Sequence, residues 1–254
     1  MKPAARWGAW LDTLLPPVCA ACGTTLDDTE ADDALCALCW SRAPRIVPPL
    51  CPRCGGPRAD APDDAPCVEC AEWPIFVVCA RAPFAMDGPA AAAIRALKYG
   101  GYWRLARAMA RRMAAVRLDP RTETECAAVL PVPLAPARER ERGYNQAALL
   151  AESVARLRGW PYEGAVLRRT RETDSQTVRD PAARAANVQG AFAASSRARA
   201  LRGAHVVLVD DVLTTGATAI ECARSLCRAG VRAVGVWAFA RALTTPRIHE
   251  HEEE

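Results

Sequence analysis

Residues 206–218 constrain the fold of this chain more than any other stretch. They read Val-Val-Leu-Val-Asp-Asp-Val-Leu-Thr-Thr-Gly-Ala-Thr. Four apolar residues without polar alternation predict a strand that is buried on both faces, as strands of parallel sheets are. Two acids, Asp210 and Asp211, follow at once, and after a short turn the pattern becomes helical. The sequence therefore predicts an α/β domain built on a parallel sheet.

The turn that follows this strand is suited to a phosphorylated sugar. Its residues are small: Thr214, Thr215, Gly216, Ala217 and Thr218. A ligand can approach such a turn closely, and free backbone amides at the start of a helix attract a phosphate. The carboxylates of Asp210 and Asp211 suit sugar hydroxyls or a divalent cation.

Two other phosphate-binding motifs are excluded by missing residues. The chain has no Gly-Lys-Ser or Gly-Lys-Thr, as a Walker loop requires, and no Gly-x-Gly-x-x-Gly fingerprint for dinucleotides. An ordinary strand–turn–helix unit without a ligand would have a capping box, and Thr218 and Glu221 have the spacing for one. We expect that capping box to form, with Glu221 on the outward face of the helix, and it is compatible with a bound phosphate.

Cysteine spacing is the second strong constraint. Eight of the twelve cysteines form four Cys-x-x-Cys pairs, and two pairs supply the four thiolates of a closed tetrahedral zinc site. Adjacent pairs would group as Cys19, Cys22, Cys36 and Cys39 on one ion and Cys51, Cys54, Cys67 and Cys70 on a second. Spacing alone does not exclude the crossed grouping, first pair with third and second with fourth.

The zinc sites are expected to be structural. Few large aliphatic residues lie between the pairs, and structural zinc contributes ~10–16 kcal/mol of apparent binding energy in small modules. Without metal this region should be unfolded. The chain shows no export signal and no long apolar run, so we expect reduced cysteines, a cytoplasmic location and no membrane insertion.

Charge divides the chain into two parts. Residues 1–75 hold eleven acidic against six basic side chains, whereas the whole chain has a net charge of +4. We expect an N-terminal amphipathic helix and a double zinc ribbon in residues 1–75, an α/β domain in residues 76–243 and a polar tail in residues 244–254. The acidic ribbon is unsuited to gripping nucleic-acid phosphates, which need Lys and Arg.

Three further segments could complete a site for a sugar diphosphate. A strand over residues 126–133 leads into a second junction with Arg138, Arg142, Asn145 and Gln146. Lys98 precedes two glycines, where it either contacts phosphate or complements the helix dipole. Residues 168–202 contain eight arginines and three acids and predict a basic lid that includes Gln176, Arg179 and Arg184.

Together these motifs resemble the ComF family. The resemblance is carried by the cysteine pairs, Leu97–Gly100, Pro131–Leu134, Arg142–Gln146, the lid residues with Asn187, and Val209–Thr218. It implies a double zinc ribbon in front of a type I phosphoribosyltransferase-like domain that binds phosphoribosyl diphosphate (PRPP) with Mg²⁺. By this resemblance Asp210 and Asp211 would bind ribose hydroxyls, and residues 214–218 would bind the 5′-phosphate. Mg²⁺ and the loop near Pro133 would hold pyrophosphate.

The resemblance also implies a role in DNA uptake during natural transformation, with single-stranded DNA as a partner. It leaves the phosphoribosyl acceptor undefined; if the protein is a glycosyltransferase, Asp211 is the best candidate for the base. One alternative is a non-catalytic module that binds single-stranded DNA or regulates another protein on the same fold. Another is a zinc ribbon that docks a protein partner through its acidic surface.

Overall fold

A parallel sheet forms the centre of the molecule, as the sequence predicts. The computed structural model describes residues 17–27, 33–58, 67–172 and 186–243. The sheet strands are β1 (Val77–Arg81), β7 (Ala233–Arg241), β6 (His205–Leu213) and β3 (Cys126–Pro131), in that order and all parallel, with the short β2 (Phe84–Ala85) also beside β7. The predicted strand with the two acids is β6, and it lies inside the sheet between β7 and β3.

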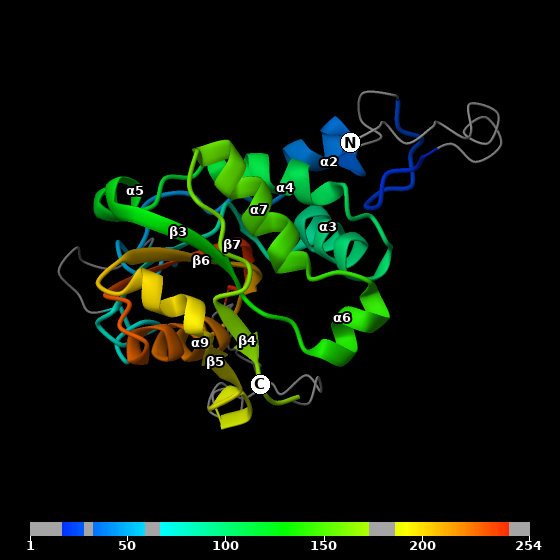
Figure 1. The fold of residues 1–254 in the computed structure, drawn as a ribbon. Helices are drawn as coiled ribbons and strands as arrows, with labels where there is room; N and C mark the ends of the chain where they lie inside the picture. The colour runs from blue at the N-terminus through cyan, green and yellow to red at the C-terminus, as the bar shows by residue number, and fades with distance from the viewer. Residues whose placement is uncertain (1–16, 28–32, 59–66, 173–185, 244–254) are drawn as a thin grey trace, which may run out of the picture.

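Helices cover both faces of this sheet (Figure 1). On one face lie α2 (Ala37–Arg42), α3 (Gly88–Tyr99), α4 (Leu105–Ala114) and α7 (Gln146–Arg158). On the other lie α9 (Ala217–Arg228) and a small hairpin of β4 (Leu167–Arg169) and β5 (Phe192–Ala194), followed by the 3₁₀ helix η2 (Ser196–Leu201). Two shorter helices flank β3 in the chain: α5 (Pro120–Glu125) before it and α6 (Pro136–Arg142) after it.

The core is divided by the sheet into two clusters. Along β6, Val207 and Val209 pack with α3, α4 and α7, whereas Val206 and Leu208 pack with α9. This alternation is the period of two that a strand imposes, and each of the four residues is fully buried. Helices cover both faces of the sheet, so every one of these β6 residues is buried and all of them are apolar.

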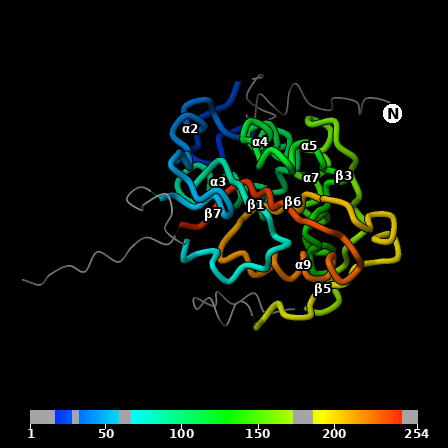
Figure 2. The backbone as a smooth tube through the Cα atoms, turned by 90° about the vertical axis from the view of Figure 1, so that its left-hand side faces the viewer, coloured from blue at the N-terminus to red at the C-terminus, as the bar shows by residue number. Residues whose placement is uncertain are grey.

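Because the strands are parallel, their carboxyl ends meet at one edge of the sheet. In the pairing of β3 with β6, Pro131 lies opposite Val209, and Asp210 lies opposite Ala238 of β7. The chain segments that follow β3 and β6 therefore leave the sheet side by side. Figure 2, turned by 90°, shows β6 between its two neighbours with α9 below it.

Two local elements differ from the expectation from sequence. Residues 136–142 form a separate helix, α6, which ends at Gly143 with a φ of +82°, where glycine is favoured. The base of the predicted lid is the β4–β5 hairpin. The lid residues Gln176, Arg179 and Arg184 lie outside the described residues, as do the predicted N-terminal helix and the polar tail.

The predicted capping box at the start of α9 is wrong. The N-cap residue is Gly216, and no side chain caps it. Glu221 is only 3% exposed rather than outward-facing, and its carboxylate accepts a hydrogen bond from the N–H of Gly190 at 3.0 Å. Glu221 therefore ties α9 to the turn before β5, a contact that helix periodicity alone could not predict.

No helix within the described ranges combines the length and the apolar character that crossing a bilayer requires.

Trp237, at the middle of β7, should be a major source of stability. It is fully buried, and its ring lies 6.0 Å from that of Trp160. We expect Trp237→Ala to lower the free energy of unfolding by about 3–5 kcal/mol, because a large cavity is left in the core. Leu157→Ala on exposed α7 surface should cost less than about 0.5 kcal/mol. Urea denaturation of the zinc-loaded protein measures both, and equal losses would contradict this account of the core.

Candidate functional site

The turn between β6 and α9, residues 214–218, is here called the phosphate loop. Gly216 adopts a φ of +83°, a left-handed conformation that favours glycine. Thr214 is exposed, Thr215, Ala217 and Thr218 are partly exposed, and Gly216 is buried. At the N-terminus of the twelve-residue helix α9, the N-cap Gly216 has no capping side chain, although the N–H of Ala217 donates to Oγ1 of Thr215 at 3.4 Å. The positive end of the helix can still attract an anion. This local structure suits a phosphate, and that the loop binds one stays a prediction.

Asp211 is the centre of a polar network beside this loop. The residue is 2% exposed, and the Nζ atom of Lys98 lies 2.5 Å from its Oδ2 atom. Gln146 donates a hydrogen bond from Nε2 to Asp211 Oδ1 at 3.0 Å, and Arg142 donates to Gln146 Oε1. Four of the residues predicted from sequence thus meet, although they come from three separate segments.

The two neighbouring carboxylates have different surroundings. Burial, and next the charge of Asp211, raise the pKa of Asp210 well above its ordinary value. Burial alone would lower the pKa of Lys98, but the ion pair with Asp211 outweighs it and raises that pKa. The ion pair thus compensates the charge of Asp211, whereas burial beside Asp211 disfavours the charged form of Asp210.

Asn145 and Arg138 have other contacts. Asn145 caps α7 by accepting from the N–H of Ala147 at 3.0 Å, and it donates to the carbonyl of Val132 at 3.0 Å. Asn145 therefore joins α7 to the loop after β3. Arg138 lies near Arg169, whose pKa is lowered first by burial and then by the charge of Arg138. Neither residue has a described contact with Asp211.

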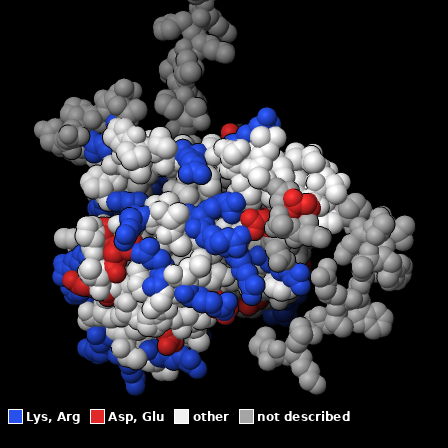
Figure 3. Space-filling view, turned by 90° about the horizontal axis from the view of Figure 1, so that it is seen from above, with Lys and Arg blue, Asp and Glu red and all other residues white. Residues whose placement is uncertain are grey.

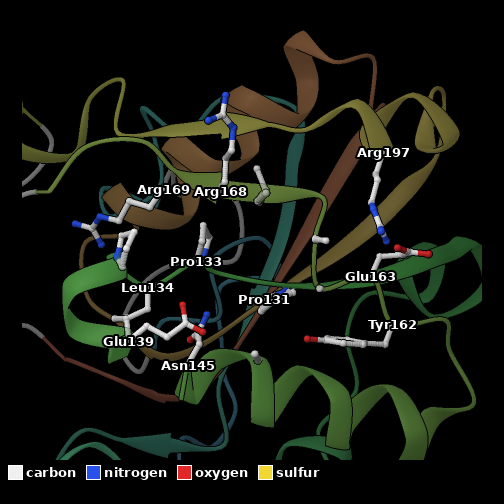
Figure 4. Close-up of a pocket in the computed structure, with 15 residues that line it drawn as sticks. Pro131, Pro133, Leu134, Glu139, Asn145, Tyr162, Glu163, Arg168, Arg169 and Arg197 are labelled. Carbon is white, nitrogen blue, oxygen red and sulfur yellow. The ribbon is translucent and has the colours of Figure 1, made fainter. Parts of the chain in front are cut away.

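A separate open pocket of about 710 Å³ lies on the far side of the β3 end. Its lining includes Arg168, Arg169, Arg197, Glu139 and Glu163, and of the predicted site residues it includes Asn145. Figure 4 shows that Arg168 and Arg169 point in different directions and that Arg197 points toward Glu163. The guanidinium groups therefore do not converge on one position. Sequence reasoning assigned no role to these three arginines, and the only signal was the arginine content of residues 168–202.

The zinc ligands form two compact clusters. The sulfur atoms of Cys19, Cys22, Cys36 and Cys39 lie within 4.8 Å of one another, and so do those of Cys51, Cys54, Cys67 and Cys70. A tetrahedral site with Zn–S bonds of 2.3 Å places its sulfur atoms about 3.8 Å apart. The Sγ–Sγ distances are 3.8 Å for Cys22–Cys36, 3.8 Å for Cys51–Cys70 and 3.7 Å for Cys54–Cys67.

Backbone amides support both clusters, as they do in zinc knuckles. The N–H of Cys36 donates to Cys19 Sγ at 3.4 Å, and the N–H of Gly56 donates to Cys54 Sγ at 3.4 Å. The donor sets thus fit two Cys₄ zinc-binding sites, grouped as adjacent pairs. We call Cys19–Cys39 the first zinc centre and Cys51–Cys70 the second. Closed Cys₄ sites of this kind are structural, because no coordination position is left for a substrate.

Comparison with known proteins places two domain models on the chain. The model for the double zinc ribbon domain matches residues 10–71, and the model for the phosphoribosyl transferase domain matches residues 141–251. The first therefore spans both zinc centres, and the second spans Gln146, β6, the phosphate loop and α9. Lys98 lies outside both matches and reaches the site only through the fold.

Two named relatives are similar to this chain over most of their length, and a third over half of its length. DNA utilization protein YhgH of Escherichia coli K12 is 33% identical over 217 residues, which are 82% of this chain and 91% of that protein. Competence protein ComFC of Bacillus subtilis is 26% identical over 83% of this chain and 84% of its own length. Competence protein F of Haemophilus influenzae is 36% identical over 45% of this chain and 50% of its own length.

The Lys98–Asp211 pair can be tested without any ligand. Lys98→Met leaves a buried carboxylate without its cation, and we expect a loss of about 3 kcal/mol in unfolding free energy. Combining it with Asp211→Asn should recover much of that loss, because no charge then remains buried. The exposed pair of Arg156 and Glu152 on α7 is the control, and its double-mutant cycle should give a coupling of only about 0.3–0.5 kcal/mol. If urea denaturation gave equal coupling energies for the two pairs, Lys98 would not be the cation that compensates the buried charge of Asp211.

Proposed function

Because the chain belongs to the ComF family, we propose that it binds PRPP together with Mg²⁺ at the carboxyl end of β6. The observation that carries this proposal is a network of one ion pair and two hydrogen bonds beside the phosphate loop. It connects four residues: Lys98, Asp211, Gln146 and Arg142. The loop amides would hold the 5′-phosphate, Asp210 would face the ribose hydroxyls, and Asp211 would keep Lys98 and Gln146 in place beside them.

A role for Mg²⁺ is supported by the state of Asp210. A raised pKa disfavours the charged form of Asp210, and a bound divalent ion would favour it. Asp210 would therefore help to hold Mg²⁺, which would supply positive charge for the pyrophosphate. Arg142 at the end of α6 and the loop after β3 are the nearest candidates to contact the pyrophosphate oxygens.

Transfer of the phosphoribosyl group would pass through a cationic ribosyl transition state. The protein would need to hold the departing pyrophosphate in place and keep water away. If the acceptor releases a proton, Asp210 in its charged form is better placed to take it than Asp211, the candidate from sequence. Both oxygens of Asp211 are already engaged, one by Lys98 and one by Gln146, whereas Asp210 accepts only the N–H of Asp211 at 2.8 Å among its described hydrogen bonds.

Calorimetric titration with PRPP and Mg²⁺ tests this proposal directly. Changing Asp210 and Asp211 together to Asn removes the carboxylate that would contact the ligand and the one that keeps Lys98 and Gln146 in place, so affinity should fall roughly 100-fold or more. Asp87→Asn, at the far end of α3, is the matched control and should bind as the wild type does. Absence of binding heat with the wild-type protein would overturn the proposal.

A second proposed function is binding of single-stranded DNA, in a role in DNA uptake. The connection between α3 and α4 exposes three aromatic residues, Tyr99 at 80%, Tyr102 at 41% and Trp103 at 51%. The guanidinium of Arg142 lies 5.5 Å from the Tyr99 ring, and that of Arg104 lies 5.3 Å from Trp103. Exposed rings beside arginines suit the stacking of unpaired bases.

A basic surface continues from these rings. Arg104 and Arg107 are exposed at the start of α4 and along it, and so is Arg111, which pairs with Asp33. Figure 3, seen from above, shows Lys and Arg spread over this side of the molecule, with Asp and Glu in fewer places. Such a surface can follow a phosphate backbone, and the relatives named for DNA utilization and competence support the same partner.

Fluorescence anisotropy with a labelled oligothymidine tests this second function. Tyr99→Ala combined with Trp103→Ala should weaken binding at least tenfold, since each stacked base contributes about 1–3 kcal/mol. Binding should also weaken steeply with added salt. Leu157→Ala, which removes an equally exposed side chain from α7, should have no effect. Unchanged binding by the aromatic variant would refute this surface.

A further inference from the structure

Trp73 connects the second zinc centre to the phosphate loop. It comes three residues after the ligand Cys70, and its N–H donates to the carbonyl of Cys70 at 3.1 Å. The side chain is 7% exposed, and its ring packs against the backbone of Gly216. A methyl group added to Gly216 would lie only 2.8 Å from Cζ2 of the indole. The ring is therefore in direct contact with the loop, on a side closed to solvent.

Arg53 fixes the segment that carries Trp73. It lies inside the Cys51-x-x-Cys54 knuckle of the second zinc centre. Its guanidinium donates to four carbonyls, those of Cys70 at 3.1 Å, Trp73 at 2.8 Å, Pro74 at 2.7 Å and Val77 at 3.1 Å. The position of this segment thus depends on a side chain that the zinc knuckle holds.

A second tie joins the same centre to the sheet. Arg241, at the end of β7, is 3% exposed, donates to the carbonyl of Cys54 at 2.7 Å and pairs with Glu69. The N–H of Ala80 in β1 also donates to the carbonyl of Arg53 at 2.7 Å. The second zinc centre is therefore held against the carboxyl ends of β1 and β7, beside the strand that leads into the phosphate loop.

The first zinc centre has different neighbours. Trp40 follows its ligand Cys39 and packs against Phe84 and Phe239, on the face of the sheet covered by α3 and α4. Trp73 instead belongs to the core cluster on the α9 face. The two centres thus have equivalent ligands but lie in different cores.

We propose that Trp73 is a positioning residue for the phosphate loop, and that zinc at the second centre, acting through Arg53, sets where Trp73 lies. Loss of this zinc would release the ring from Gly216 and loosen the amides of the loop. Loss of zinc from the first centre would leave the loop unchanged. The consequence for ligand affinity rests on the proposed binding of PRPP, whereas the effect on the loop does not.

The main test replaces each buried tryptophan in turn while both zinc ions stay bound. Trp73→Leu should speed hydrogen–deuterium exchange in peptides spanning residues 212–220 and weaken PRPP binding about tenfold, since a loosened site loses its prepared geometry. Trp73→Phe should restore most of both properties, because a flat ring can again cover Gly216. Trp40→Leu is the matched control and should change neither. Metal analysis of each variant is the control and should give about two zinc ions per chain, which would show that both metals are retained.

A second test removes one zinc ion at a time. Cys70→Ser and Cys39→Ser should each leave about one zinc ion per chain. Only Cys70→Ser should speed exchange in the phosphate loop, and equal effects of the two variants would contradict the coupling. If the wild type binds no PRPP but Trp73→Leu still loosens the loop, the proposed function fails and the positioning role stands. If PRPP binds and Trp73→Leu alters neither exchange nor affinity, the positioning role is refuted.

Discussion

The buried carboxylate of Asp211 is the constraint on which the arrangement of this protein depends. A charge at the end of an enclosed strand is costly unless a cation and hydrogen-bond donors surround it. Lys98 from the end of α3 and Gln146 from the start of α7 supply that compensation. These contacts hold one end of α3 and one end of α7 at the edge of the sheet where β6 ends. Burial and the neighbouring charge of Asp211 raise the pKa of Asp210, which accepts only the N–H of Asp211 among its described hydrogen bonds and so retains capacity for a ligand.

The second zinc centre lies against the same edge of the sheet. The ribbon that contains both centres has few large aliphatic side chains, so metal coordination replaces a hydrophobic core of its own. The ribbon residues that do become buried, such as Trp40 and Trp73, pack into the cores on opposite faces of the sheet. Through Arg53 and Arg241 the second centre is hydrogen-bonded to the sheet. The ribbon is thus joined to the larger domain by side chains rather than by a linker alone.

Much of the fold and part of the site could be predicted from local sequence. The enclosed strand at 205–213 and the glycine turn after it are each specified by neighbouring residues. Contacts between distant segments were harder to predict. Glu221 has the spacing of a capping box, but the turn at Gly190 takes its carboxylate, because tertiary packing offered a better-placed donor. The hairpin of β4 and β5 was not predicted, since each strand has only three residues and the long segment 170–191 separates them.

The sequence by itself determined the chemistry: two sets of four thiolates, a loop suited to phosphate and the acids beside it. These follow from residue type and short spacing, which act over one turn of the chain. Only the tertiary structure decided which groups meet. The pairing of Lys98 with Asp211 spans 113 positions in the numbering, and the contact of Trp73 with Gly216 spans still more. Such contacts depend on the parallel sheet, because it brings the ends of distant strands to one edge. The partner of a buried charge there can therefore come from a distant part of the sequence.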